Sequence, residues 1–295
     1  MNTLIFKDEK WIEYFDPLQI FSCGQAFHWH REEDKSITAV HGESWINVKK
    51  EDTTVCWQFS DKDEEGKWLR YFDLNTDYSK IVQRVSKISL MQEAAQYGKG
   101  IRILRQEPFE TIMTFILSAN NHIPRIKKGV EDLSRIYGKE ITPFRDRKLY
   151  AFPTVEEFEK ISKEELREVI KVGYRDKAMV ETCKKIASGD FDMEKTADLS
   201  TEKLRKELLT LPGVGPKVAD CILLFAYNRM EVFPVDVWIH RVMEDYFFNE
   251  KGSKKEIHRK STEIFGKDAG YAQQYLFFYG RAFGIGKKGK KPKER

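Results

Sequence analysis

Two residues nineteen positions apart, Lys217 and Asp236, carry the side chains best suited to covalent chemistry. Lys217 stands in LPGVGPKVADC, the segment from 211 to 221, and Asp236 stands in FPVDVWIHR. An amine is a nucleophile, and a carboxylate fixed beside it can stabilise positive charge on a sugar carbon. The pair could therefore displace a group from a sugar.

The segment around Lys217 predicts two helices joined by a tight turn, with the hairpin at 211–215. STEKLRKELLT before the turn is amphipathic, and PKVADCILLFAYN after it also fits a helix. We expect Gly213 and Gly215 to take positive φ, because glycine does so at no steric cost. Pro216 suits the first helical position, where an N–H would have no partner. Backbone N–H groups of such a helix–hairpin–helix can bind a DNA phosphate.

Position alone leaves two interpretations for each residue of the pair. Lys217 falls in the first turn of a helix, where the dipole disfavours a cation and favours the neutral, nucleophilic amine. It could equally be a phosphate-binding or ordinary surface lysine. Asp236 is a natural N-cap for the helix that follows, and capping alone would explain it. The joint pattern is more specific to sugar chemistry than either half.

The elements that must position this pair divide the chain into a β-rich part and a helical part. Up to about residue 72, SITAVHGESWINVKK and TTVCWQFS alternate apolar and polar residues, with a turn at Gly42. Five tryptophans there predict a sheet core: Trp11, Trp29, Trp45, Trp57 and Trp68. From about residue 75 the period becomes helical, and Ser162 with Glu165 predicts a capping box.

Composition restricts the class of protein. Hydrophobic residues make up 41% and charged residues 33%, which suits a folded domain. No apolar run approaches the ~20 residues of a membrane helix, and the N-terminus lacks the apolar core of a signal peptide, so we expect an intracellular protein. The four cysteines are far apart, and FHWH holds only two neighbouring histidines, so we expect no metal and no disulfide framework. The basic tail at 287–295 is expected to be disordered, as a solubilising end or a weak nucleic-acid contact.

LPGVGPKVADC and PVDVWIHR together resemble the helix–hairpin–helix–Gly/Pro–Asp signature of DNA glycosylases. Within that superfamily the chain is similar to the 8-oxoguanine DNA glycosylases. Four further segments match that family's motifs in its order: GQAFHW (24–29), LRQEPFETIMTFILSANNHIPRI (104–126), GYR (173–175) and AGYAQQYLF (269–277). The resemblance covers nearly the whole chain.

The resemblance implies an α+β fold. It places a TBP-like N-terminal domain, an antiparallel β-sheet with helices, at 1–103. An all-α region of two helical subdomains follows at 104–286. It also implies a monomer that acts in the cytoplasm or nucleoid of a prokaryote, or in the nucleus of a eukaryote.

The activity implied is that of a bifunctional DNA glycosylase and AP lyase in base excision repair. Lys217 would attack C1′ of the damaged nucleotide and expel the base, with Asp236 assisting. The Schiff base so formed would allow β-elimination, which nicks the strand 3′ to the lesion. No cofactor is implied, and the partner is duplex DNA containing 8-oxoguanine opposite cytosine.

The damaged base must leave the duplex, at a cost of a few kcal/mol. The resemblance places it between Cys221 and Phe277, with Gln273 bonding its Watson–Crick edge and the Gly24 carbonyl accepting its N7–H. Without the motif, Phe277 would be a core aromatic and Gln273 a surface amide.

Four residues correspond to contacts with the vacated duplex. Asn120 would fill the gap, Arg125 and Arg175 would face the orphaned cytosine, and Tyr174 would wedge into the adjacent stack. Without the motif, Arg125 would belong to a solvated or phosphate-binding basic patch.

Two residues depart from the family pattern near the expected DNA contacts. Trp238 stands where vertebrate members carry histidine, and His122 is the third residue of the asparagine run. Because of these two departures, the resemblance does not determine the phosphate contacts or the preference for the opposite base. The alternatives are a glycosylase for another damaged base and a noncatalytic helix–hairpin–helix DNA-binding module, which would not need Lys217 and Asp236 together.

Overall fold

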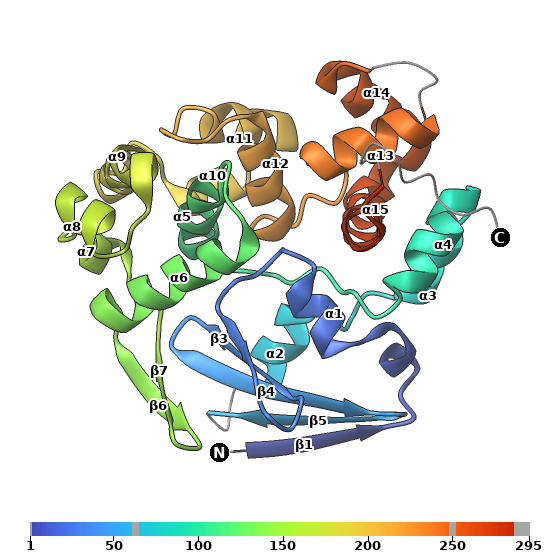
Figure 1. The fold of residues 1–295 in the computed structure, drawn as a ribbon, viewed down its shortest axis with the longest axis horizontal. Coiled ribbons are helices and arrows are strands. Elements are labelled where there is room, and N and C mark those ends of the chain that lie inside the picture. Colours follow the sequence, from blue (N-terminus) through green and yellow to red (C-terminus); the bar gives the residue numbers. More distant parts are fainter. Residues whose placement is uncertain (1, 61–64, 248–251, 286–295) are drawn as a thin grey trace.

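The computed structural model describes residues 2–60, 65–247 and 252–285 of the chain. The predicted division into a β-rich first part and a helical second part is confirmed: strands β1 to β5 form one layer, and most helices lie beyond it (Figure 1). The basic tail at 287–295 lies outside the described residues.

The N-terminal sheet follows from alternating sequences that fold into antiparallel hairpins. Burial along the last strand alternates from residue to residue, as one-sided packing requires. Gly42 has a φ of 60° between the third and fourth strands, which confirms the predicted turn. The strand order is β1-β5-β4-β3-β2, with each neighbouring pair antiparallel. The strands are β1 (Asn2–Lys7), β2 (Trp29–Arg31), β3 (Ile37–His41), β4 (Ser44–Glu51) and β5 (Thr54–Phe59).

Two short helices, α1 (Pro17–Ser22) and α2 (Glu65–Tyr71), cover one face of this sheet (Figure 1). Their apolar side chains and those of the strands form an aromatic core around Trp57 and Trp68, both fully buried. The predicted tryptophan-rich sheet core is confirmed at these two positions and at Trp29, whereas Trp45 is buried in a separate cluster and Trp11 is only partly buried.

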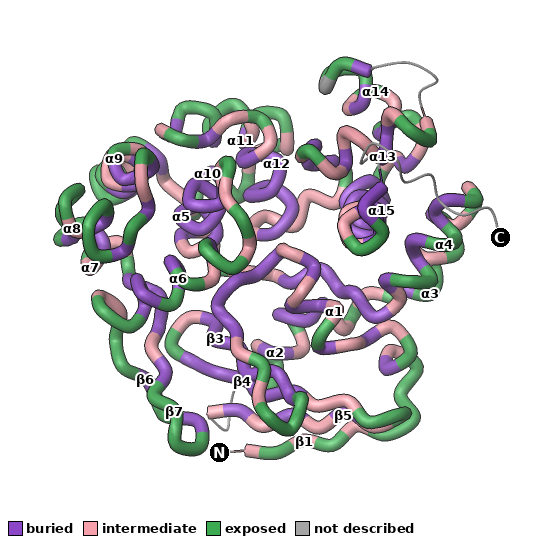
Figure 2. The backbone as a smooth tube through the Cα atoms, viewed as in Figure 1, coloured by how far each residue is buried: buried purple, intermediate pink, exposed green. Residues whose placement is uncertain are grey.

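The helical part is arranged around α5, in which every residue from 111 to 118 is buried (Figure 2). Helix α12 packs against α5, and α4 and α13 pack against α15. The helices are α3 (Tyr78–Val85), α4 (Ser89–Tyr97), α5 (Pro108–Ser118), α6 (Ile123–Tyr137), α7 (Val155–Phe158), α8 (Lys163–Glu168), α9 (Asp176–Ala187), α10 (Met193–Ala197), α11 (Thr201–Leu208), α12 (Pro216–Phe225), α13 (Val237–Phe247), α14 (Lys254–Phe265) and α15 (Ala269–Phe283). The capping box of Ser162 and Glu165 is present at the start of α8.

The helical part contains one two-stranded sheet that the sequence pattern did not predict. It consists of β6 (Glu140–Phe144) and β7 (Arg147–Tyr150). The Phe144 ring lies 4.7 Å from the Trp45 ring of β4, centroid to centroid. Because this hairpin is short and rests on the N-terminal sheet, tertiary packing rather than local periodicity stabilises it.

Helices α3 and α4 precede residue 103, yet their apolar faces do not join the sheet core. They contribute Ile81, Met91 and Ala94 to the larger core that also contains α5, α12 and α15. The sheet region and the helical region are thus tied together by packing as well as by the chain.

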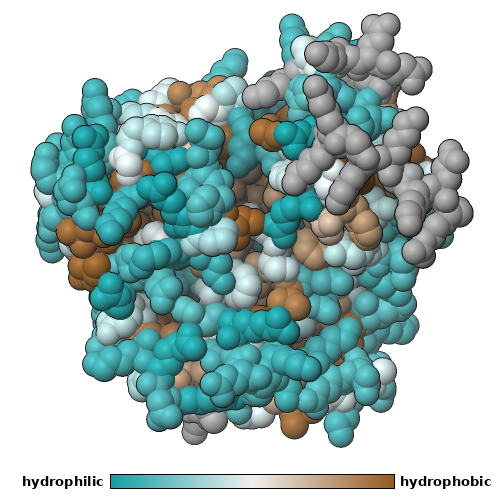
Figure 3. All heavy atoms as spheres, in the orientation of Figure 1, coloured by the Kyte–Doolittle hydropathy of each residue, from teal (hydrophilic) through white to brown (hydrophobic). Residues whose placement is uncertain are grey.

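The face drawn in Figure 3 is mainly hydrophilic, and its hydrophobic side chains form separate small patches. Within the described ranges, no helix combines the length and the apolarity that crossing a bilayer requires.

Candidate active site

The predicted hairpin joins α11 and α12, with Pro216 in the first turn of α12. Gly213 has a φ of 81°, so the prediction of a positive φ is confirmed there. The same prediction is wrong for Gly215, whose φ is −91°, because it is the N-cap of α12 and takes extended backbone. A Cβ atom on Gly215 would meet nothing within 4 Å, so this glycine keeps the hairpin surface open.

The hairpin is held from behind by α5 and α9. A Cβ atom on Gly213 would lie 2.8 Å from the Ala178 Cβ, so only glycine allows this approach. The Thr182 hydroxyl donates to the Pro212 carbonyl at 2.9 Å, which fixes the turn against α9. These contacts leave the outer side of the hairpin free for a partner.

Lys217 lies at the start of α12 and is half-buried. Its ammonium is 5.4 Å from the centroid of the Phe115 ring, and its charge opposes the rise that burial causes in the pKa of the Cys221 thiol. It also interacts electrostatically with the carboxylate of Asp236. The two residues predicted to do the chemistry are therefore brought to one place, with an aromatic ring and a thiol beside the amine.

Asp236 caps α13, as its position predicted. Its Oδ1 accepts the Ile239 N–H at 2.8 Å, and the Trp238 N–H also hydrogen-bonds the carboxylate. Burial raises the pKa of the Asp236 carboxyl, whereas these N–H groups and Lys217 oppose the rise. The cap fixes the orientation of the carboxylate, so capping and catalysis are compatible here.

Two of the predicted base-binding residues, Gly24 and Phe277, meet where the end of α1 faces α15. Gly24 has a φ of 83°, and a Cβ atom there would lie 3.1 Å from the Phe277 ring. The neighbouring Cys23 carbonyl accepts a hydrogen bond of 2.9 Å from Gln274, which ties this turn to α15. A backbone edge thus stands directly against an aromatic wall.

Gln273, which also lies on α15, carries a buried hydrogen-bond acceptor. Gln273 is 5% exposed, and its side-chain Oε1 has no hydrogen-bond partner within the described part of the chain. A buried acceptor without a partner costs free energy, so it indicates a group that a ligand completes.

Three of the predicted duplex contacts converge on the end of α5. Tyr174 is 65% exposed, and its hydroxyl donates to the Ala119 carbonyl at 3.2 Å. Arg175 is buried and donates to the carbonyls of Ala119 at 2.8 Å and Asn120 at 3.0 Å. Asn120 itself is exposed with a φ of 50°, a left-handed conformation that asparagine tolerates.

The fourth predicted contact, Arg125, is exposed at the start of α6 and donates to the Lys171 carbonyl at 3.0 Å. Its guanidinium and that of Arg175 flank Gly173, at 4.0 and 3.8 Å from a Cβ atom placed there. Burial lowers the pKa of Arg175, and the Arg125 charge adds to this effect. Two adjacent cations, one exposed on Arg125 and one buried on Arg175, can together bind an electron-rich group.

Trp238, which departs from the family pattern, is half-buried two residues after Asp236. The Arg241 guanidinium lies 5.4 Å from the centroid of its ring. An indole here replaces a titratable imidazole by a ring that donates one hydrogen bond.

Three residues at the site were missed by sequence reasoning: Phe115, Gln274 and Arg281. Phe115 faces Lys217, and Gln274 holds the turn before Gly24. The guanidinium of Arg281 lies 5.3 Å from the centroid of the Phe277 ring. Its spacing of four residues from Phe277 on a predicted helix was the signal that could have placed it on the same face.

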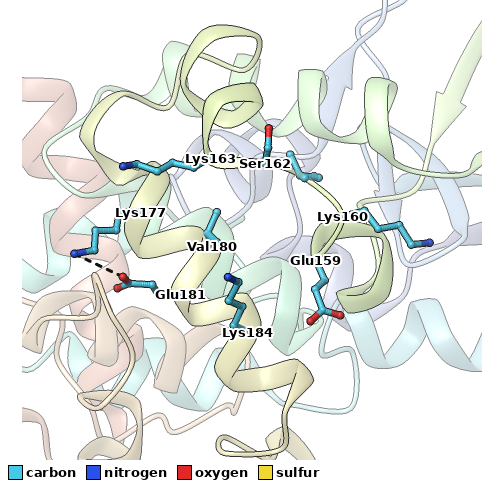
Figure 4. A pocket seen from close by; sticks show the side chains of 9 residues that line it. Glu159, Lys160, Ser162, Lys163, Lys177, Val180, Glu181 and Lys184 are labelled. Carbon is cyan, nitrogen blue, oxygen red and sulfur yellow. Dashed lines mark ion pairs between the residues drawn. The ribbon is translucent and has the colours of Figure 1, made fainter.

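An open cleft of about 470 Å³ lies apart from this site, between α9 and the residues that join α7 to α8 (Figure 4). Its lysines are all exposed, and Lys177 pairs with Glu181 at 3.7 Å. The lysines are Lys160, Lys163, Lys177 and Lys184. None of them shares the half-buried position of Lys217 beside a carboxylate.

The neighbouring histidines of FHWH do not point to a metal site. The His28 Nδ1 lies 3.4 Å from the Glu110 carboxylate. In the described ranges, no group of three or more histidine, cysteine or acidic residues is placed to hold a metal ion.

Two family models match the chain in succession. Residues 8–112 match the 8-oxoguanine DNA glycosylase N-terminal domain. Residues 113–267 match the HhH-GPD superfamily base excision DNA repair proteins. The second match contains the hairpin, Lys217 and Asp236.

Several known proteins are similar to this chain. A probable N-glycosylase/DNA lyase of Methanothermobacter thermautotrophicus is 31% identical over 64% of the chain and 66% of its own length. The N-glycosylase/DNA lyase of Saccharomyces cerevisiae is 33% identical over 66% of the chain and 55% of its own length. The Clostridium acetobutylicum 8-oxoguanine glycosylase/lyase, solved with duplex DNA containing cytosine opposite 8-oxoguanine, is 37% identical with a TM-score of 0.89. That alignment covers 92% of this chain and 94% of the other.

Proposed function

The chain belongs to the HhH-GPD superfamily of base excision DNA repair proteins, and on this premise we propose that it excises 8-oxoguanine from duplex DNA and then cleaves the strand. The match of its N-terminal part to the 8-oxoguanine DNA glycosylase domain supports this substrate. The observation that carries the proposal is that Lys217 and Asp236, both half-buried, interact electrostatically beside the buried Cys221.

Lys217 would act as the nucleophile. Its neutral amine attacks C1′ of the damaged nucleotide, the C1′–N9 bond breaks, and the base leaves with the bonding electron pair and takes up a proton. Asp236 would stabilise the positive charge that develops on the sugar as this bond lengthens. The sugar then opens to a Schiff base on Lys217, loss of a C2′ proton expels the 3′ phosphate, and water releases the lysine.

Selection of 8-oxoguanine over guanine would depend on the Gly24 carbonyl. The oxidised base carries a hydrogen on N7 that this carbonyl can accept, whereas guanine presents a lone pair. A buried acceptor left unpaired costs about 1–3 kcal/mol, which corresponds to roughly 5- to 150-fold in rate or affinity. Phe277 would stack on the base, and the unpartnered Oε1 of Gln273 would accept from its Watson–Crick edge.

The opposite base would be read by the paired guanidinium groups of Arg125 and Arg175. Cytosine offers them a carbonyl and a ring nitrogen, which suit planar donors. Asn120 would occupy the space that the extruded nucleotide leaves. All these residues belong to one chain, so we further propose that the monomer is active.

A substrate comparison tests the proposed function. Excision should be fastest for duplexes containing 8-oxoguanine opposite cytosine, when compared with guanine, thymine glycol and alkyladenine. Faster release of any of the other three would assign the protein to another glycosylase class. Release of none of the four, with DNA binding intact, would favour a noncatalytic module.

The role of Asp236 is tested by Asp236→Asn, which retains an oxygen for the cap but removes the charge. Excision should slow by about 10²- to 10³-fold, as for loss of one electrostatic stabiliser. Affinity for the duplex should change little. Asp245→Asn, at an exposed position of the same helix, is the matched control. If Asp236→Asn reduced excision and duplex binding equally, Asp236 would serve only as the N-cap of α13.

A further inference from the structure

Arg281 on α15 contacts both sides of the base pocket. Its guanidinium donates a hydrogen bond to the carbonyl of Ser22, two residues before Gly24. The same group lies 5.3 Å from the Phe277 ring centroid and 5.9 Å from that of Phe278. One side chain therefore connects the backbone turn and the aromatic wall between which the base would lie.

Arg281 also acts on the charges of the site. It interacts electrostatically with Asp236, on the neighbouring helix α13. The other groups that face Asp236 are Lys217 and Cys221, both on α12, and the N–H groups of its own helix. Arg281 is thus the second cation beside a carboxylate whose burial disfavours its charged form.

The position of this arginine is costly. Burial lowers the pKa of the guanidinium, and its Nη1 is buried without a hydrogen-bond partner in the described part of the chain. A half-buried charge with a buried, unsatisfied donor costs free energy that a neutral side chain at this point would avoid. If Arg281 served only to pack α15 against α1, its replacement by a long apolar residue would increase the stability of the protein.

We propose that Arg281 is a positioning residue of the excision step, which holds the Gly24 turn against Phe277 and stabilises the ionised form of Asp236. This inference rests on the proposed function of the site. It assigns Arg281 no contact with the sugar and no proton transfer. Arg281 affects the rate of excision indirectly, because it positions the Gly24 turn and Phe277 and stabilises the charge of Asp236.

The test compares Arg281→Met and Arg281→Lys in single-turnover excision of 8-oxoguanine as a function of pH. Without the arginine, the pKa of Asp236 should rise further, because a favourable charge is lost. The acidic limb of the Arg281→Met profile should therefore move up by about one pH unit, and the lysine variant should restore most of this shift. Arg84→Met removes the ion pair of 2.6 Å to Asp268 at the start of the same helix, and it should lower stability without moving the limb.

Two results would overturn the proposal. One is an Arg281→Met profile whose acidic limb coincides with that of the unmodified protein. The other is weaker binding of undamaged duplex with a smaller salt dependence, because that would make Arg281 a phosphate contact. If the unmodified protein does not release 8-oxoguanine, the proposed function itself fails, which is a separate outcome.

Discussion

The sheet core and the proposed base pocket are both lined by aromatic rings, but they differ in the polar groups that lie beside those rings. Around Trp57, rings pack with centroids 4.9–6.5 Å apart, and the buried guanidinium of Arg102 beside them donates to the backbone carbonyls of Phe72, Asp73 and Thr76. Around Phe115 and Phe277, an ammonium and a guanidinium lie over the rings, and a carboxylate and an amide are held nearby. The first arrangement provides stability, and the second retains charge out of water at a cost in stability.

The comparison predicts that the largest loss of stability follows from opening the sheet core. Trp57→Ala should lower the free energy of unfolding by about 3–5 kcal/mol, because the ring is fully buried. Denaturant titration measures the loss. The folded fraction should still excise 8-oxoguanine with an unchanged pH profile.

Trp57→Phe is the matched control for that change. Its ring keeps much of the packing and removes an indole N–H that has no partner in the described residues, so the loss should be well below that of alanine. Equal losses for the two variants would contradict a packing role for the indole.

The pocket should respond in the opposite direction. Gln273→Leu removes the buried, unpartnered Oε1 and should raise the free energy of unfolding by about 1–3 kcal/mol while excision falls. Gln274→Leu, one residue along α15, should instead destabilise, because the Cys23 carbonyl loses its donor. If both variants lower the free energy of unfolding equally, the unpartnered Oε1 of Gln273 does not destabilise the folded protein.

The stability of the N-terminal sheet should depend on pH and fall in acid. His41 of β3 is buried, and burial lowers its pKa to about 3, against 6.5 in the unfolded chain. The unfolded state binds a proton first, so stability is full above pH 6.5 and falls as the pH drops from 6.5 toward 3. Between pH 7 and 5 the loss from His41 should approach ~2 kcal/mol, measured by denaturant titration.

His41→Gln should flatten this dependence, because the glutamine does not titrate. A slope that remains the same would place the sensitivity elsewhere, for example at His30 of β2, where burial lowers the pKa to about 4.

Sequence alone predicted the parts of the site that local rules determine. Pro216, Gly213 and the cap at Asp236 follow from helix-end chemistry, and each is present as expected. The predicted positive φ of Gly215 was wrong because a glycine before a helix can serve either as a turn residue or as an N-cap with extended backbone. Local sequence does not distinguish the two roles.

The rest depends on contacts between residues that are far apart in the chain. Gly24 meets Phe277, and Arg281 reaches Ser22, only after α1 and α15 have packed together. The β6–β7 hairpin likewise depends on Trp45 of the sheet. Periodicity predicted the elements, whereas the pocket arises from their packing.

The central claim is that Lys217 forms a covalent bond with the sugar of the damaged nucleotide. Borohydride reduces a Schiff base to a stable amine, so the unmodified protein should become cross-linked to a duplex containing 8-oxoguanine, with the adduct mapping to Lys217 by mass spectrometry. Lys217→Gln should abolish the adduct, and Lys206→Gln, at an exposed position of α11, should not. An adduct that persists in Lys217→Gln, or that maps to another residue, would contradict the account.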